Sequence, residues 1–203
     1  MVSGWIELVI AFVTGVIGPI FVLFVKNRLE NKEKPDMVTE TLRVSELVTH
    51  KIEHIKEEFN ADRVWITQFH NGGNFYPTGK SMAKFSIMYE TVHPGVPSVQ
   101  GNFHNIPVNL FSKSINELLQ NDVIEIPDYK DESIATFGLK YIAEDTNCKS
   151  GYLFAIKTID DKFIGTLGLD YTKRKTKLDI EAVNHLMVHA TSLGGVLMTH
   201  LQQ

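Results

Sequence analysis

Cysteine is almost absent from this chain of 203 residues, which contains Cys148 and no other. A single thiol cannot close an internal disulfide, and it cannot supply a zinc ribbon or a CxxC redox pair, both of which need further cysteines. The sequence therefore excludes a covalent framework, and a reducing compartment is the simpler expectation.

Dense positive charge is also missing. The net charge is −4 at pH 7, and the one basic run in the body of the chain is TKRKTK, residues 172–177. Because binding to nucleic acid needs a stripe or patch of Lys and Arg, no nucleic-acid partner is expected. We interpret the short run as a solvated loop that precedes a helix.

Charged side chains are nearly lacking at the N-terminus too. From Trp5 to Val25 the only ionisable residue is Glu7, and about 20 apolar residues suffice to span a bilayer. A cleavable signal peptide begins with basic residues and has a shorter apolar core, whereas here the basic residues follow the apolar stretch. The pattern predicts a retained anchor, residues 1–25, with one transmembrane helix over residues 5–25. A signal peptide and a buried core helix are the alternatives.

A charged linker, residues 26–36, follows the predicted span. It contains four cations and a proline that closes it: Lys26, Arg28, Lys32, Lys34 and Pro35. No Lys or Arg precedes the span, so the positive-inside rule places the C-terminal domain in the cytoplasm. The expected localisation is therefore the membrane, with a single pass.

The remaining residues, 37–203, are expected to form one domain. The predicted elements are a helix over residues 37–59, strands over 62–69 and 84–92, a helix over 109–121, a strand over 123–129, a helix over 138–147, two strands within 150–172 and a final helix over 178–201. Apolar residues recur near a 3.6-residue period in the first and last helices. In the first helix the predicted stripe is Leu42, Val48, Ile52, Ile55 and Phe59. Asp36 is its expected N-cap, and Thr176 is the expected cap of the last helix.

This order of elements resembles that of a GAF domain, the sensory relative of the PAS fold. DKFIGTLGLDY, residues 161–171, is similar to the penultimate hairpin of GAF domains, and VIEIPDY, residues 123–129, is similar to the short strand that enters their pocket-covering helices. The resemblance implies an α+β fold, a GAF-like antiparallel sheet flanked by helices and preceded by a single transmembrane helix. It also implies that the first and last helices share one face of the sheet and that a ligand pocket lies on the other. Another α+β sandwich is the alternative.

Departures from that family narrow the function. The chain has no NKFDE-type signature of cyclic-nucleotide-binding GAF domains, and Lys149 follows Cys148 where bilin-attaching domains have a histidine. The GAF-fold methionine-sulfoxide reductase uses several cysteines, and this chain has one. None of these three activities is expected, and no cofactor is predicted.

The stretch FHNGGNFYPTGKS, residues 69–81, is longer than a plain hairpin turn, which needs two to five residues. If the strands on either side pair, Trp65, Thr67, Phe69, Phe85, Ile87 and Tyr89 share one face and form the core. The other face and the loop then gather polar groups and two glycines. These are the predicted binding residues for a small polar or anionic ligand: His70, Asn71, Gly72, Gly73, Lys84, Ser86 and Glu90. The alternative is a solvent-facing strand pair with a long exposed loop.

Catalytic and metal sites are not predicted. A nucleophile needs an adjacent base and an orienting third group, and only His70 with Ser86 or Glu90 offers a start, so the chain is not expected to be an enzyme. Two histidine pairs have metal-ligand spacing, His50 with His54 beside Glu46 and Glu58, and His185 with His189 beside Glu181. Without an HExxH motif, histidines on the wet side of a helix need no explanation, so metal binding by these pairs is left open.

Together these features predict a membrane-anchored cytoplasmic sensor or regulatory module that binds a small ligand. No kinase, cyclase or DNA-binding segment follows the last helix, so its signal is expected to pass to a partner or along the linker. A homodimer through the first and last helices is also expected. The alternative is a non-enzymatic, membrane-associated interaction or accessory protein, of a virus-encoded kind for example, whose GAF-like domain binds no ligand.

Overall fold

The computed structural model describes residues 2–30, 36–131 and 139–201. The chain forms two compact units, Met1–Glu40 and Thr41–Gln203. Within the predicted linker, Lys32, Lys34 and Pro35 lie outside the described residues, as does residue 138, the expected start of a helix.

The N-terminal unit contains one long apolar helix. It comprises α1 (Val2–Phe12), a π-helical turn, η1 (Val13–Ile17), and α2 (Gly18–Glu30). Residues Gly4–Asn27 are long and apolar enough to cross a membrane. A signal sequence near the N-terminus has the same properties. The anchor, the span over residues 5–25 and the orientation therefore stay predictions.

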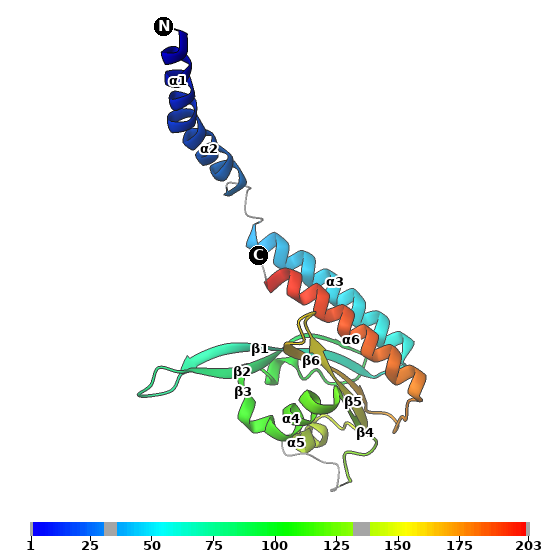
Figure 1. Cartoon of the computed structure of the whole chain (residues 1–203). Coiled ribbons are helices and arrows are strands. Elements are labelled where there is room, and N and C mark those ends of the chain that lie inside the picture. Colours follow the sequence, from blue (N-terminus) through cyan, green and yellow to red (C-terminus); the bar gives the residue numbers. More distant parts are fainter. Residues whose placement is uncertain (1, 31–35, 132–138, 202–203) are drawn as a thin grey trace. The chain divides into compact units, whose positions relative to one another are not determined.

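The second unit is built on a six-stranded antiparallel sheet with the order β3-β2-β1-β6-β5-β4 (Figure 1). The strands are β1 (Arg63–Asn74), β2 (Ser81–Val92), β3 (Ile106–Pro107), β4 (Val123–Ile126), β5 (Ser150–Lys157) and β6 (Phe163–Tyr171). The central strands are rich in β-branched and aromatic residues, which favour a pleated, half-buried surface. This architecture confirms the predicted α+β class.

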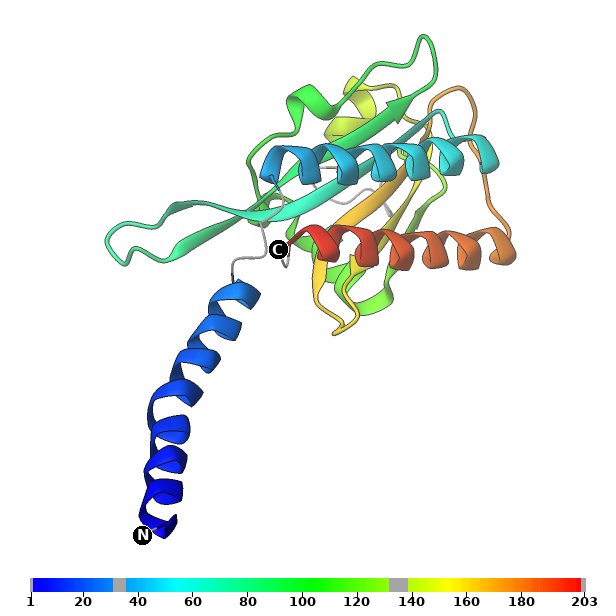
Figure 2. The ribbon, with the colours of Figure 1, turned by 90° about the horizontal axis from the view of Figure 1, so that it is seen from above.

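Helices α3 (Met37–Glu58) and α6 (Ile180–Leu201) cover one face of the sheet and run side by side in opposite directions (Figures 1 and 2). Their inner faces and the strands beneath form the main core, in which Val48, Ile52 and Leu193 are fully buried. As predicted, Asp36 caps α3, because the amide of Thr39 donates to its Oδ2 at 3.1 Å.

Two details of these helices were predicted wrongly. Leu42 is 65% exposed, and Val44 is buried in its place, so the apolar stripe of α3 begins two residues later than expected. Asp179, not Thr176, caps α6, since the amide of Ala182 donates to Asp179 Oδ1 at 2.8 Å. Thr176 instead donates its amide to Ser150.

Short helices and turns cover the opposite face of the sheet (Figure 1). They are the 3-10 turns η2 (Gln100–Asn102) and η3 (Val108–Phe111) and the helices α4 (Ser112–Asn121) and α5 (Leu139–Asp145). A second, smaller core lies on this side and includes Leu118, Ile126, Tyr129 and Leu153. Both faces of the sheet are therefore covered, as the resemblance implied.

The long loop expected at residues 69–81 is mostly strand. β1 and β2 stay paired as far as Asn74 and Ser81, while β6 pairs with β1 only as far as Gln68. The two strands therefore continue beyond the sheet as a ribbon (Figures 1 and 2), which we call the arm, residues 70–83. Its tip is a six-residue turn closed by the amide of Phe75, which donates to the carbonyl of Lys80 at 2.8 Å.

A bulge between Ile66 and Thr67 changes which side chains share a face. Met88 is the extra residue, so Tyr89 pairs with Ile66 and packs against the helix-side core. Glu90 pairs with Trp65 and lies on the opposite side of the sheet. The predicted grouping of Tyr89 with Trp65 and of Glu90 with His70 was therefore wrong, because a bulge reverses the alternation that follows it.

Candidate ligand-binding cavity

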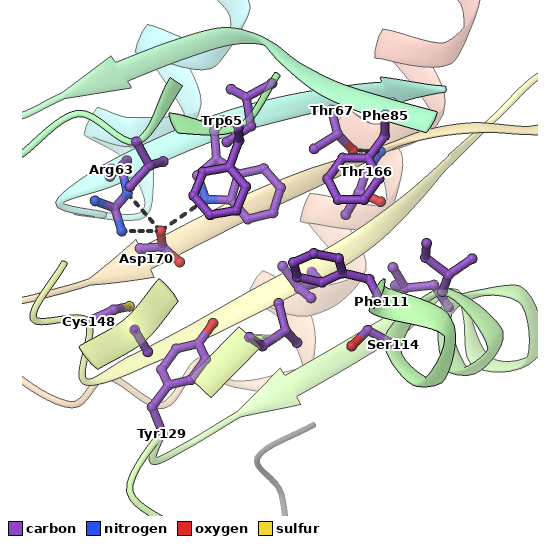
Figure 3. Close-up of a pocket in the computed structure, with 18 of the residues that line it drawn as sticks. Arg63, Trp65, Thr67, Phe85, Phe111, Ser114, Tyr129, Cys148, Thr166 and Asp170 are labelled. Carbon is purple, nitrogen blue, oxygen red and sulfur yellow. Dashed lines mark hydrogen bonds and ion pairs between the residues drawn. The ribbon is translucent and has the colours of Figure 1, made fainter. Parts of the chain in front are cut away.

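A cavity lies between the sheet and the segment from η2 to α5, on the side away from α3 and α6 (Figure 3). The volume of this cavity is about 60 Å³. Most of its wall is apolar: Trp65, Phe69, Phe85, Ile87, Val99, Phe103, Phe111, Ile115, Leu118, Leu139, Ala143 and Leu153.

Alternation along the central strands brings this wall together. Arg63, Trp65, Thr67 and Phe69 of β1 all line the cavity, as expected for residues two apart on a strand. Gly168 of β6 lies opposite Trp65, and a Cβ added there would come within 2.2 Å of the indole ring. A glycine is therefore required at this position for the indole to cover β6.

A buried ion pair closes one end of the cavity. The Arg63 guanidinium contacts Asp170 Oδ2 through Nε at 2.8 Å and through Nη2 at 2.7 Å, and the indole N–H of Trp65 donates to the same oxygen at 2.9 Å. Arg63 also donates to the Pro97 carbonyl at 2.9 Å and to the Thr146 hydroxyl at 3.1 Å. Burial by itself lowers the pKa of Arg63, but the Asp170 carboxylate outweighs it and the pKa is raised. The positive charge is thus fully engaged within the protein.

Four residues with hydroxyl groups line the cavity: Thr67, Ser114, Tyr129 and Thr166. Tyr129 is 6% exposed, and its hydroxyl points into the cavity (Figure 3) without a hydrogen-bond partner among the described residues. Burial and then the charge of Asp170 raise its pKa well above the ordinary value, so the phenol stays neutral. The Thr67 hydroxyl accepts a hydrogen bond from the amide of Thr166 at 3.1 Å and keeps its proton for donation.

The cavity also contains the chain's one thiol. Cys148 is buried and donates its S–H to the Ser150 carbonyl at 3.3 Å. Burial, followed by the neighbouring Asp170, raises the pKa of this thiol. Because the thiolate is the reactive form, Cys148 is not an activated nucleophile here.

The residues predicted as a binding site lie elsewhere, and none of the seven lines this cavity. His70 Nε2 is 2.9 Å from the Ser86 hydroxyl, which also accepts the amide of Asn105 at 2.9 Å. Lys84 runs beside Gly72, where an added Cβ would come within 2.6 Å of its Cδ. Asn71 and Gly73 are on the arm, exposed to solvent. Ligand binding by this group stays a prediction.

Glu90 is separated from that group and supports the cavity wall instead. Its carboxylate accepts the amides of Val99 at 2.8 Å and Gln100 at 3.1 Å, together with the Ser98 hydroxyl. Since Val99 is part of the wall, Glu90 holds that segment against the sheet.

Sequence reasoning missed Arg63, Asp170 and Tyr129. One signal was available. Arg63 is the first residue of the apolar strand β1, and Asp170 is the last but one of the apolar strand β6. An unpaired charge buried in either strand would be costly. Their pairing was not readable, because 107 residues separate them. Tyr129 stood in the noted VIEIPDY stretch, but nothing in the local pattern indicates which way its side chain points.

No protein-family model and no curated protein matches this chain. Solved structures do. A far-red cyanobacteriochrome photoreceptor matches with a TM-score of 0.63 and 14% identity, over 89% of this chain and 98% of that one. The phycocyanobilin-bound GAF domain of a cyanobacterial phytochrome matches with a TM-score of 0.61 and 16% identity, over 82% and 94%.

The blue-light absorbing form of the Thermosynechococcus elongatus PixJ GAF domain matches with a TM-score of 0.60 and 12% identity, over 77% of this chain and 85% of that one. Identities this low are informative about architecture alone. The second unit of the chain has the GAF fold.

Proposed function

We propose that this chain is a membrane-anchored, non-enzymatic GAF sensor or regulatory module. Its cavity takes a small, mainly apolar molecule that carries one hydrogen-bonding group. The observation that carries the proposal is the Tyr129 hydroxyl, which points into a mainly apolar cavity without a protein partner. A few well-placed polar groups in an apolar pocket fix the orientation of a ligand, and this hydroxyl is available for that role.

The size and charge of the cavity favour such a ligand over the one predicted from sequence. An enclosed water molecule needs roughly 10–15 Å³, so a cavity of about 60 Å³ has room for a molecule the size of about four to six waters. The Arg63 charge is already paired with Asp170, which argues against an anion.

The bilin named for one of the solved structures is also disfavoured here. A tetrapyrrole is far larger than the space available. Cys148, the only thiol that could attach one, is buried and protonated.

The anchor and the dimer belong to the same proposal. The helix Gly4–Asn27 serves as a single span, and the GAF domain faces the cytoplasm, where the sensed molecule is met. Apolar side chains stay exposed on α3 and α6, including Leu42 at 65% and Val188 at 64%. Such side chains favour a second copy of the chain as the partner of these helices.

Thermal melting of the full chain in detergent tests the ligand. Phenol, indole and short alcohols are the probes, because each combines a small apolar body with one polar group. We expect phenol to raise the melting temperature, and Tyr129→Phe to weaken its binding roughly 2- to 10-fold, the loss of one hydrogen bond. Ala143→Phe, which fills the cavity, should abolish binding. No shift with any probe at millimolar concentration would remove the sensor proposal.

A second candidate function rests on the arm. Tyr76 is 97% exposed and Phe75 is 50% exposed at its tip, which favours an interaction protein that binds no ligand. In that case Tyr76→Ser with Phe75→Ser would abolish capture of a partner, and the melting temperature would not respond to the probes.

A further inference from the structure

Three side chains that can bind a metal ion converge between α3 and α6, on the side of the sheet away from the cavity, and a fourth lies beside them. His54 and Glu58 come from α3, and His185 and His189 come from α6. The two residues of each pair are four apart, so each pair shares one face of its helix. The helices run side by side (Figures 1 and 2), and the two pairs face each other across the seam.

The Glu58 carboxylate is at the centre of this cluster. Its Oε2 is 3.3 Å from His54 Nδ1 and 3.2 Å from His189 Nε2, and its Oε1 is 2.9 Å from His185 Nδ1. The ligand atoms of His54, Glu58 and His189 all lie within 4.8 Å of one another. The ring centres of His185 and His189 are 4.7 Å apart.

The Glu58 carboxylate can only accept hydrogen bonds, so without an ion the three facing histidine nitrogens each carry a proton toward it. Neutral imidazoles can make these contacts, since each has one N–H to donate. A metal ion would take the place of these protons, because an imidazole binds a metal through a nitrogen lone pair.

The distances suit a tetrahedral ion. With metal–ligand bonds of about 2.1 Å, tetrahedral ligand atoms lie about 3.4 Å apart. Glu58 Oε2 is 3.3 Å from His54 Nδ1 and 3.2 Å from His189 Nε2, which is close to that spacing. Imidazole and carboxylate ligands suit zinc.

We propose that His54, Glu58 and His189 bind one Zn²⁺, that the neighbouring His185 turns in as the fourth ligand, and that the ion joins α3 to α6. Four protein ligands leave no open position, so the site is structural rather than catalytic. Because α3 follows the linker, the ion fixes the first helix of the domain to the last.

The surroundings of the cluster support this role. Phe59, which is 9% exposed, packs edge-on against His185 and His189 with ring centres 5.9 and 6.1 Å away, so it restricts how these imidazoles turn. The side chains of His54 and His185 are 64% and 54% exposed. An ion therefore reaches the site without any opening of the core.

The test is Zn²⁺ binding by the full chain in detergent, produced without a histidine tag and stripped with a chelator. Calorimetry should show one Zn²⁺ per chain, and Zn²⁺ should raise the melting temperature. Co²⁺ should give the visible absorption of a tetrahedral site. We expect His189→Ala and Glu58→Gln each to weaken binding at least 10-fold.

Matched variants separate a specific site from loose binding to surface histidines. His50→Ala removes an exposed histidine one turn before His54 on the same helix and should leave Zn²⁺ affinity unchanged. His185→Gln alters a half-exposed position, which keeps the test valid if His189→Ala fails to fold. Absence of Zn²⁺ binding, or affinity that His54→Ala and His185→Gln leave unchanged, would overturn the proposal.

Discussion

The two faces of the sheet differ although the same strands build them. Toward α3 and α6, β1 and β6 present Val64, Ile66, Leu167 and Leu169, all fully buried. Toward α4 and α5 the same strands present Arg63, Trp65, Thr166 and Asp170 around a cavity. The first face is apolar and filled, whereas the second holds polar groups and space. Along each of these strands, every second residue packs in the filled core, and the residues between them lie on the cavity side.

The largest effect is expected from the buried ion pair on the cavity side. Asp170→Asn leaves the Arg63 charge buried without its counterion, and the free energy of unfolding should fall by about 3–5 kcal/mol. Chemical denaturation measures it. The double variant Arg63→Met, Asp170→Leu removes both charges and should recover most of the loss. A single variant as stable as the wild type would show that the pair is not buried as described.

On the filled face, a smaller side chain should lower stability by leaving an empty space in the core, and not by leaving a charge unpaired. Ile52 is fully buried on the inner face of α3, and Ile52→Ala should lower the free energy of unfolding by about 2–5 kcal/mol. Probe binding in the cavity should keep its affinity. If Ile52→Ala created or removed binding in the cavity, the two faces would not be independent.

Replacing a small buried side chain by a larger one should have opposite effects on the two faces of the sheet. Ala61, in the filled core, and Ala143, on the cavity wall, are both buried. Ala61→Leu should destabilise the domain by about 1–3 kcal/mol through overpacking, whereas Ala143→Leu should be tolerated or slightly stabilising because it enters existing space. Equal losses in thermal melting would contradict the presence of a cavity.

A smaller, pH-dependent effect is expected at Asp62, just before β1. Burial raises the pKa of this carboxyl. Hydrogen bonds from the amides of Thr172 and Lys173, at 2.8 and 3.0 Å, and the nearby Lys173 ammonium lower the pKa by more than burial raises it, so the net shift is downward. A lowered pKa in the folded state stabilises the protein above the unfolded value of 3.8, and that contribution is lost as the pH falls through the folded value.

Asp62→Asn should therefore reduce stability by about 1 kcal/mol at neutral pH and show a smaller loss in acid. Denaturation curves between neutral pH and pH 3 measure the difference. Parallel curves for the two proteins would contradict the assigned hydrogen bonds.

The helix-covered face was largely predictable, and the cavity face was not. A 3.6-residue period and the Asp36 cap located α3, although Val44 rather than Leu42 proved to be buried. The arm was misread because Asn71, Gly72 and Gly73 are turn residues by type and nevertheless lie within β1, where Asn71 pairs with Ala83 and the two glycines fall at an irregularity in the register. Pairing with β2 outweighed their local preference.

The cavity face depends on contacts distant in sequence. The bulge at Ile66 and Thr67 contains no glycine that would have marked it, and it reverses the side of every later residue of β2. The ion pair between Arg63 and Asp170 joins strands far apart in the chain. Alternation predicts which residues share a face only while the register is unbroken.

Trp65 provides the most direct test of the cavity. The chain has two tryptophans: Trp65 in the cavity wall, with its indole N–H on Asp170, and Trp5 in the N-terminal helix, which serves as an internal control. We predict that phenol shifts the indole N–H resonance of Trp65 in the full chain and leaves that of Trp5 in place, and that Tyr129→Phe reduces the shift at equal phenol concentration. Resonances that stay unchanged at saturating phenol, or shifts confined to His70 and its strand partner Lys84, would contradict the assignment of this cavity as the binding site.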